Sequence, residues 1–215
     1  MVNIERKEPA PTCLQTQTDY KCGDVLEKLE KVFFGKCYIC ETATFSTNVE
    51  HFKAHQGDIA LKFDWNNLFL ACNHCNNIKL TTEILNCTDP NHDVEERIEY
   101  NSISVIEQPI EIKANNNYND KLTKDTVDLL NKVYNGHTKI KTIDAKKLKM
   151  SLIKEMLQFQ NLMLDYYEGK NNIHKLAEIE RNIKVELHKG SKLTAFKRQI
   201  IKDFENYSPL KQYFD

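Results

Sequence analysis

Apolar residues recur at three- and four-residue steps along much of this chain, a spacing that places them on one face of an α-helix. Asp24 can cap the first of these helices, and Gly35 ends it. Further helical stripes are predicted over residues 123–136, 145–169, 176–190 and 191–204, the last with Ser191 as its cap. We expect these stripes to form the core of a helical bundle in the C-terminal half.

Other stretches are rich in β-branched and aromatic residues, which favour strands. We predict strands over residues 47–52 and 63–71, separated by a loop around Gly57 and followed by a helix. Residues 98–113 alternate in part between apolar and polar positions, with Pro109 at an edge or a break. This last pattern predicts a β-hairpin.

The order of these elements predicts an α+β fold in three parts. Residues 1–23, where Pro9 and Pro11 discourage helix, are expected to be extended. Residues 24–114 contain the predicted strands and two cysteine pairs, and residues 115–215 are mainly helical. The last part is a candidate for contact with a partner or with nucleic acid.

Composition indicates a folded chain without a membrane span. Hydrophobic residues make up 40% and charged residues 28%, and no apolar run approaches the roughly 18 residues that a span requires. The opening segment, MVNIERKEPAPT, contains acidic residues and no apolar core, unlike a signal peptide. We therefore expect a cytoplasmic protein with no membrane partner.

The net charge of -1 conceals an uneven distribution. Residues 137–202 contain 15 Lys or Arg against 7 Asp or Glu, which leaves 15 against 24 in the remainder. A basic surface of this kind can contact phosphates, and the alternative is a solvated helical face.

Two CxxC pairs, Cys37/Cys40 and Cys72/Cys75, are separated by about 30 residues. Each pair can direct both sulfurs to one ion, so the four thiolates predict a structural Zn²⁺ site. The alternative is a redox or packing role. The other cysteines, which we expect to be free thiols in a reducing compartment, are Cys13, Cys22 and Cys87.

The segment between the pairs contains residues suited to phosphodiester hydrolysis. His51 has a side chain that can take a proton from water near neutral pH, and a carboxylate such as that of Glu50, together with an amide oxygen, offers the oxygen donors that suit Mg²⁺ or Mn²⁺. Neighbouring side chains on a strand point to opposite faces, so Glu50 reaches a metal beside His51 only if the strand is bent or twisted.

In order along the chain, CYIC, VEHF and DWNNLFLACNHCNNIK resemble the signature of HNH endonucleases. The resemblance implies a ββα-metal nuclease motif over residues 37–80, with a zinc held by the two CxxC pairs, inside a nuclease domain at 24–114. The sequence departs from many members of the family at Glu50, where they have Asp, and at Asn76, where they have His.

The same resemblance implies a role for each residue of the motif. His51 would be the general base, Glu50 and Asn76 the ligands of a catalytic Mg²⁺ or Mn²⁺, and Asn67 the residue that orients the histidine and its loop. Structural alternatives are a buried histidine at His51, a salt bridge at Glu50, and a turn or helix-cap role at Asn67 and at Asn76. Lys79 is a candidate phosphate contact or an exposed helical lysine.

The wider segments GKCYICE, VEHFKAH, ILNCTDPNHDVEERIEY and TVDLLNKVYNG resemble the HNH subunit, called PtuB, of Septu-type anti-phage systems. This resemblance covers roughly residues 30–160. It implies a PtuA-like ATPase partner of the ABC or SMC-like type and, in retron-associated systems, a reverse transcriptase with its RNA–DNA hybrid.

These observations predict a metal-dependent endonuclease that acts on DNA or RNA, with transfer RNA among the candidate substrates. One alternative is a zinc-ribbon module that binds nucleic acid or assembles a complex without cleavage. Another is a restriction-type nuclease that acts alone, although near-neutral overall charge favours a partner that delivers the substrate. His55, His74 and His92 are further candidates for substrate contact, and His74 is left out of the zinc ligand set because four sulfurs already complete it.

Overall fold

Every helix predicted from the apolar periodicity forms in the computed structural model, which describes residues 1–43, 47–101, 104–136, 138–169 and 173–215. The helices are α1 (Gly23–Phe33), α2 (Ile59–Lys62), α3 (Asn73–Lys79), α4 (Val94–Arg97), α5 (Lys121–Asn135), α6 (Lys139–Gly169), α7 (Ile173–Leu187) and α8 (Thr194–Asp203). The strands are β1 (Thr47–His51), β2 (Leu68–Cys72), β3 (Ile98–Asn101) and β4 (Glu111–Ala114). The described chain is therefore mixed α+β with a helical C-terminal region, as predicted.

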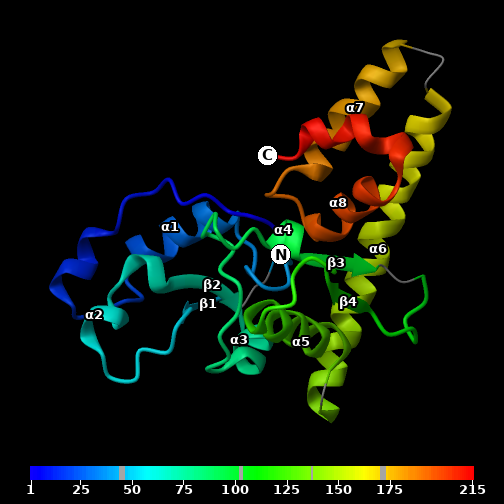
Figure 1. Ribbon diagram of the computed structural model, residues 1–215. Helices are drawn as coiled ribbons and strands as arrows, with labels where there is room; N and C mark the ends of the chain where they lie inside the picture. The colour runs from blue at the N-terminus through cyan, green and yellow to red at the C-terminus, as the bar shows by residue number, and fades with distance from the viewer. Residues whose placement is uncertain (44–46, 102–103, 137, 170–172) are drawn as a thin grey trace.

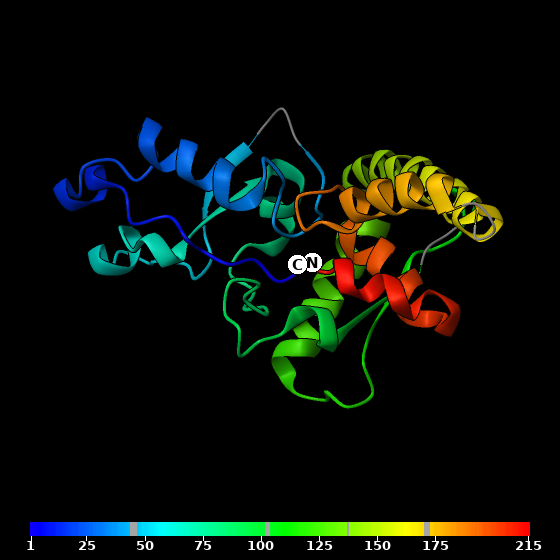
Figure 2. The ribbon, with the colours of Figure 1, turned by 90° about the horizontal axis from the view of Figure 1, so that it is seen from above.

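The elements form two groups that meet through α3 and α5 (Figure 1). On one side, α1 packs against β2, and α3 packs against both β1 and β2. On the other side, α6 and α7 lie side by side, as the view from above also shows (Figure 2), and α8 packs against α7. We call residues 37–43 and 47–79 the β1–β2–α3 unit.

The first hairpin is antiparallel and buries its second strand completely. Glu50 pairs with Phe69, and His51 pairs with Leu68. All five residues of β2 are buried because α1 covers one face and α3 lies against the hairpin. The Phe69 ring packs against Phe33 and Phe52 at centroid distances of 5.4 and 4.8 Å. A small aromatic core therefore fixes the strand that carries the second cysteine pair.

The predicted strand over residues 63–71 is shorter than expected. Residues Trp65–Asn67 form a 3-10 turn, and only Leu68–Cys72 is strand. Asp64 explains the difference, since its side chain accepts a hydrogen bond from Asn66 N at 2.9 Å and caps the turn.

The predicted hairpin over residues 98–113 is confirmed, with β3 antiparallel to β4. The cap predicted at Ser191 is wrong. Leu193, with a φ of 52°, is the N-cap of α8, and no side chain caps it. The Ser191 hydroxyl instead donates to Glu186 Oε2 at 3.1 Å, so it is engaged away from the helix end.

The N-terminal segment is mostly irregular, but it is not an isolated extended arm. Thr12–Thr16 form a 3-10 helix, and Ile4 is buried, with its N–H donating to the Cys87 carbonyl at 2.7 Å. The Arg6 guanidinium lies 4.6 Å from the Phe69 ring centroid and donates to the Leu68 carbonyl. The segment therefore covers β2.

Part of the basic charge of the C-terminal region is used inside the fold. Lys197 is fully buried and pairs with Glu155 at 2.7 Å and with Glu186. Arg198 is also buried and donates to both carboxylate oxygens of Glu95, at 2.9 and 3.0 Å. The surface is consequently less basic than the residue counts suggest.

Candidate functional site

The four paired cysteines converge at one place from different elements. Cys37 and Cys40 lie in the turn after α1, Cys72 ends β2, and Cys75 lies in α3. Their sulfurs all lie within 4.8 Å of one another, and Cys40 Sγ is 3.9 Å from Cys72 Sγ. Four thiolates around one tetrahedral zinc at about 2.3 Å would be about 3.8 Å apart. The cluster can therefore hold a zinc ion.

Local hydrogen bonds position the first cysteine pair, and burial changes the pKa of two of the four thiols. The Cys37 N–H donates to the Thr42 carbonyl at 3.1 Å and the Glu41 N–H donates to the Cys37 carbonyl at 2.9 Å, which closes the first pair into a tight turn. Burial raises the pKa of the Cys37 and Cys75 thiols. Thiolates at these positions need a cation to balance their charge, so the surroundings suit a closed structural site.

His51 is the last residue of β1, and one of its two ring nitrogens bonds to the backbone. Nε2 lies 2.9 Å from the Lys62 carbonyl. A carbonyl only accepts, so Nε2 donates, and the neutral ring keeps the lone pair on Nδ1. Nδ1 has no hydrogen-bond partner among the described residues. Burial lowers the pKa of this half-buried histidine, although the Lys62 carbonyl opposes the shift. The ring is therefore suited to accept a proton at Nδ1.

Asn67 holds the loop on which the His51 contact depends. Its side chain is buried and bonds to backbone groups alone: Oδ1 accepts from Lys53 N at 2.7 Å, and Nδ2 donates to the carbonyls of Lys53 at 2.9 Å and Leu61 at 3.0 Å. Leu61 directly precedes Lys62, whose carbonyl holds the histidine. The geometry fits the orienting role expected of this asparagine.

Glu50 and Lys79 form a buried ion pair beneath the hairpin. Glu50 Oε1 is 2.8 Å from Lys79 Nζ and 3.3 Å from the Tyr38 hydroxyl. Glu50 Oε2 is buried and has no hydrogen-bond partner in the described chain. Burial raises the pKa of Glu50, while Lys79 acts in the opposite direction. The salt-bridge alternative for Glu50 is thus present in the structure.

Lys79 requires a correction. The sequence predicts either a phosphate contact or an exposed helical lysine, but this side chain is fully buried, and its Nζ also donates to the Phe52 carbonyl at 2.8 Å. Phe52 N in turn donates to the Asn67 carbonyl at 2.8 Å. Lys79 therefore binds α3 to the end of β1 and is not positioned for substrate.

Asn76 lies in α3 directly after Cys75, and its side chain is half-buried. The alternative that Asn76 caps this helix is wrong. Cys72 is the N-cap, with its sulfur accepting from Cys75 N at 3.4 Å. The Asn76 side chain makes no hydrogen bond within the described residues, which leaves its amide oxygen available to a ligand.

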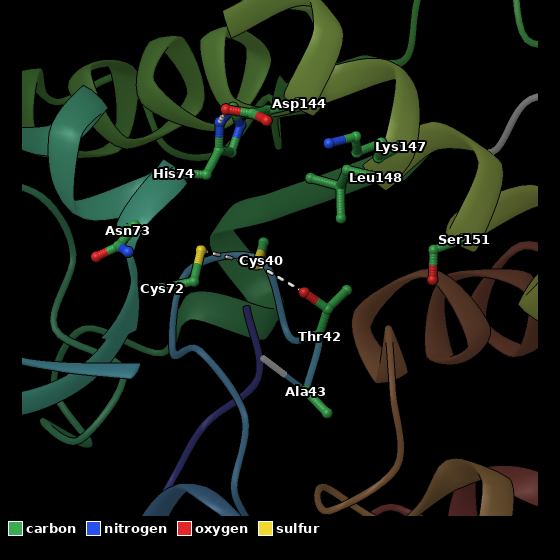
Figure 3. Close-up of a pocket in the computed structure, with 10 residues that line it drawn as sticks. All are labelled: Cys40, Thr42, Ala43, Cys72, Asn73, His74, Asp144, Lys147, Leu148 and Ser151. Atoms are coloured by element: carbon green, nitrogen blue, oxygen red, sulfur yellow. Dashed lines mark hydrogen bonds and ion pairs between the residues drawn. The ribbon is translucent and has the colours of Figure 1, made fainter. Parts of the chain in front are cut away.

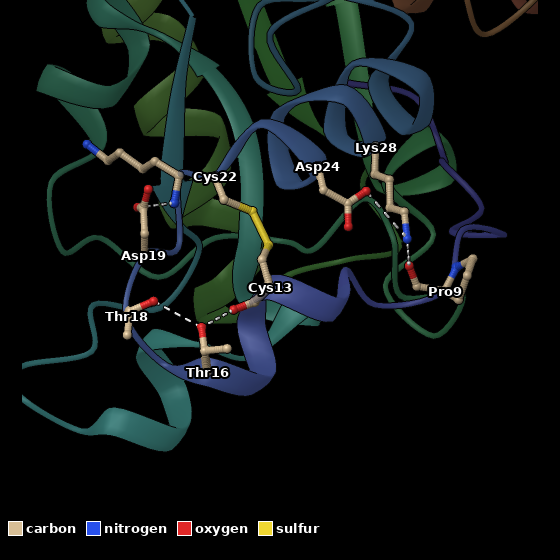
Figure 4. The surroundings of a disulfide bond; sticks show 9 residues. Pro9, Cys13, Thr16, Thr18, Asp19, Cys22, Asp24 and Lys28 are labelled. Atoms are coloured by element: carbon tan, nitrogen blue, oxygen red, sulfur yellow. Dashed lines mark hydrogen bonds and ion pairs between the residues drawn. A yellow bond between two sulfur atoms is a disulfide. The ribbon is translucent and has the colours of Figure 1, made fainter.

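The His51 ring contacts two other rings, and the sequence did not predict that the three would meet. The ring centroid of Tyr20 lies 4.5 Å away and that of His55 lies 4.7 Å away. The sequence predicts His55 as a candidate for substrate contact, whereas no local pattern singles out Tyr20. The loop carrying Tyr20 is closed by a disulfide between Cys13 and Cys22 (Figure 4).

This disulfide corrects the expectation that all three remaining cysteines are free. Cys13 and Cys22 are bonded across nine positions, while Cys87 is a buried free thiol. Their pairing follows from the 3-10 turn at Thr12–Thr16, which folds the segment back toward the start of α1. The inference of a reducing compartment therefore loses this support.

A pocket of about 520 Å³ lies beside the cysteine cluster, between α3 and the first half of α6 (Figure 3). His74 Nε2 donates to the Val133 carbonyl at 2.8 Å, and Nδ1 lies 3.6 Å from Asp144 Oδ2. His74 therefore connects α3 to α5 and α6 rather than joining the sulfurs.

Within the described residues, every helix is too short or too polar to cross a bilayer.

Comparisons with known proteins give no assignment: no family model matches this chain, and neither does any curated protein or solved structure.

Proposed function

We propose that this chain is a metal-dependent endonuclease of the HNH type, with a ββα-metal motif formed by β1, β2 and α3. The observation that carries the proposal is the arrangement of His51. The Lys62 carbonyl lies 2.9 Å from Nε2 and fixes the tautomer of the ring. Asn67 in turn bonds to the loop that supplies this carbonyl. A positioned neutral imidazole is the group that phosphodiester hydrolysis needs to take a proton from water. The resemblance of VEHF and DWNNLFLACNHCNNIK to the HNH signature supports the same function.

A divalent cation belongs to this proposal. Glu50 Oε2, which is buried without a hydrogen-bond partner among the described residues, and the amide oxygen of Asn76 are hard donors of the kind that Mg²⁺ and Mn²⁺ prefer. When bound, such a cation supplies positive charge to stabilise the leaving oxygen. Lys79 competes for the same carboxylate, so only one oxygen of Glu50 remains for the metal. The zinc would be structural and take no part in catalysis.

In the proposed reaction, Nδ1 of His51 accepts a proton from a water molecule whose oxygen attacks phosphorus. The bond between phosphorus and the leaving 3′-oxygen breaks, and that oxygen takes a proton from solvent. Nε2 remains bonded to the Lys62 carbonyl, which stabilises the ring as it becomes charged. Asn67 acts through the loop and does not itself touch the reacting atoms.

The biological setting is also a proposal. The resemblance to PtuB-like subunits favours an effector nuclease of an anti-phage complex, working with a PtuA-like ATPase and, in retron systems, with a reverse transcriptase and its RNA–DNA hybrid. The substrate class, DNA or RNA including transfer RNA, is left to experiment because the same metal chemistry serves both.

The direct test is cleavage by purified protein, with and without the products of neighbouring genes, on plasmid DNA and on total RNA. We expect cutting that requires Mg²⁺ or Mn²⁺ and that His51→Ala reduces by about 10²–10⁴-fold. His188→Ala is the matched control, since His188 is exposed just after α7, packs against Phe34 and contacts none of the residues of the proposed site, so this variant should leave cutting unchanged.

Equal cutting by wild type and His51→Ala would contradict the assignment. Binding of nucleic acid without metal-dependent nicking would favour the zinc-ribbon module instead. Activity without any ATPase would favour a nuclease that acts alone.

A further inference from the structure

Helix α6 carries large apolar side chains on its solvent face at a constant spacing. Ile143, Met150, Leu157 and Leu164 follow one another at seven-residue intervals. Their exposed fractions are 58, 48, 57 and 60%. We call these four residues the outer stripe. Single exposed apolar residues are ordinary on protein surfaces, but four in one row on a continuous helix form a surface of their own.

The outer stripe is distinct from the face by which α6 joins the core. The buried apolar residues in the described part of the helix are Ala145, Leu148, Leu152, Met156, Phe159, Met163 and Tyr166. These pack toward α5, α7 and α8. The helix therefore has two apolar faces, of which the fold covers one.

Seven-residue spacing is the repeat by which α-helices pair along their length. At 1.5 Å per residue, the outer stripe extends for about 32 Å along α6. Tyr167, three residues after Leu164, is 65% exposed, and Ile153, three residues after Met150, is half-buried. These positions widen the apolar surface of the outer stripe, which is therefore suited to contact a second helix lying alongside α6.

The charges of α6 indicate which helix that is. Residues 139–154 contain six Lys and one Asp, whereas residues 155–169 contain three acidic residues and no Lys or Arg. Among those whose burial is described, the exposed ones are Lys139, Lys146, Lys147, Lys154, Asp165 and Glu168. A parallel copy of α6 would set like charges together, while an antiparallel copy sets the basic half against the acidic half.

We propose that two copies of this chain pair through antiparallel α6 helices. In this two-fold arrangement, Met150 packs against Leu157 of the second copy, and Ile143 packs against its Leu164. The same register brings Lys139 opposite Glu168 of the second copy. The inference does not depend on the proposed nuclease activity, because it uses only the outer face of α6.

Sedimentation equilibrium of the full chain over a range of concentrations tests the proposal. We expect reversible dimers for the wild type and monomers for Leu157→Glu, which places carboxylates within the apolar seam. Val185→Glu is the matched control: Val185 is 64% exposed on α7 and is not part of the outer stripe, so this variant should still dimerise. Circular dichroism should be unchanged in both variants because both side chains are exposed.

Charge exchange tests the antiparallel register. Lys139→Glu or Glu168→Lys alone should weaken the dimer, and the double variant should restore it. A wild type that stays monomeric, or a dimer that Leu157→Glu leaves intact, would overturn the proposal. Dimers in which the double charge exchange is weaker than either single one would overturn the antiparallel arrangement.

Discussion

The β1–β2–α3 unit and the helical region α5–α8 are stabilised in different ways. In the unit, β1 and β2 have five residues each and α3 has seven, and buried polar groups and four cysteines connect them. In the helical region, α6 alone has 31 residues and buries a continuous apolar face. Short elements cannot bury enough apolar area to offset the entropy of ordering them, so the unit depends on specific bonds.

The difference also separates candidate chemistry from packing. Within the unit, hydrogen bonds or ion pairs fix one side-chain atom of His51 and of Glu50 and leave another for a ligand, while both polar side-chain atoms of Asn67 hold the loop. In the helical region, the buried charges Lys197 and Arg198 pair with carboxylates within the fold. Mutations should therefore affect the two regions separately.

The largest effect is expected from Cys72→Ser. Loss of one thiolate removes zinc, whose binding supplies about 10–16 kcal/mol in small zinc domains, so the β1–β2–α3 unit should unfold. Zinc content and amide hydrogen exchange measure this, and exchange should rise far more in the unit than in α6 and α7. Cys87→Ser, at a buried thiol outside the cluster, should retain zinc. Full zinc and normal exchange in Cys72→Ser would contradict the metal site.

Lys79→Met tests the buried ion pair. Removing one partner leaves Glu50 unpaired in the interior, which should cost about 3–5 kcal/mol in denaturant unfolding. The double variant Glu50→Gln/Lys79→Met should recover part of this loss. If Glu50 also holds the catalytic cation, Lys79→Met should need less Mg²⁺ for half-maximal cleavage than the wild type. An unchanged metal requirement would leave Glu50 with a structural role alone.

Leu152→Ala tests the other side of the comparison. This fully buried side chain of α6 lies in the apolar face, and its truncation should cost about 2–5 kcal/mol in denaturant unfolding. Zinc content should stay at the wild-type level because the cysteine cluster is separate. Val185→Ala, at an exposed position, is the control and should change stability little. Zinc loss in Leu152→Ala would show that the two regions are not independent.

Asn67→Ala is expected to have the smallest effect on stability and a clear effect on activity. The loop from Lys53 to Leu61 loses three hydrogen bonds, which should cost about 1–3 kcal/mol. The Lys62 carbonyl then no longer holds His51 firmly, so the cleavage rate should fall more than substrate affinity. Asn66→Ala changes the exposed neighbour and should leave the rate unchanged. Equal rates in the two variants would remove Asn67 from the proposed site.

Much of the fold follows from local pattern. The stripes at 24–35 and 123–136 predicted α1 and α5 closely, and the two CxxC spacings predicted that four sulfurs would meet. Spacing and periodicity are properties of neighbouring residues, and a helix or a metal knuckle forms from neighbours.

Other features depended on which distant groups meet. The sequence alone suggested an exposed Lys79, free thiols at Cys13 and Cys22, and a cap at Ser191, and the structure changed each of them. A linear pattern does not show that a charged side chain is buried beside a partner from another element. It also does not show that one face of α6 stays uncovered. The sequence by itself determined the secondary-structure elements and the four cysteines that can hold zinc. Tertiary packing decided which polar atoms are bonded within the fold and which are left for a ligand, because burial and pairing arise between residues far apart in sequence.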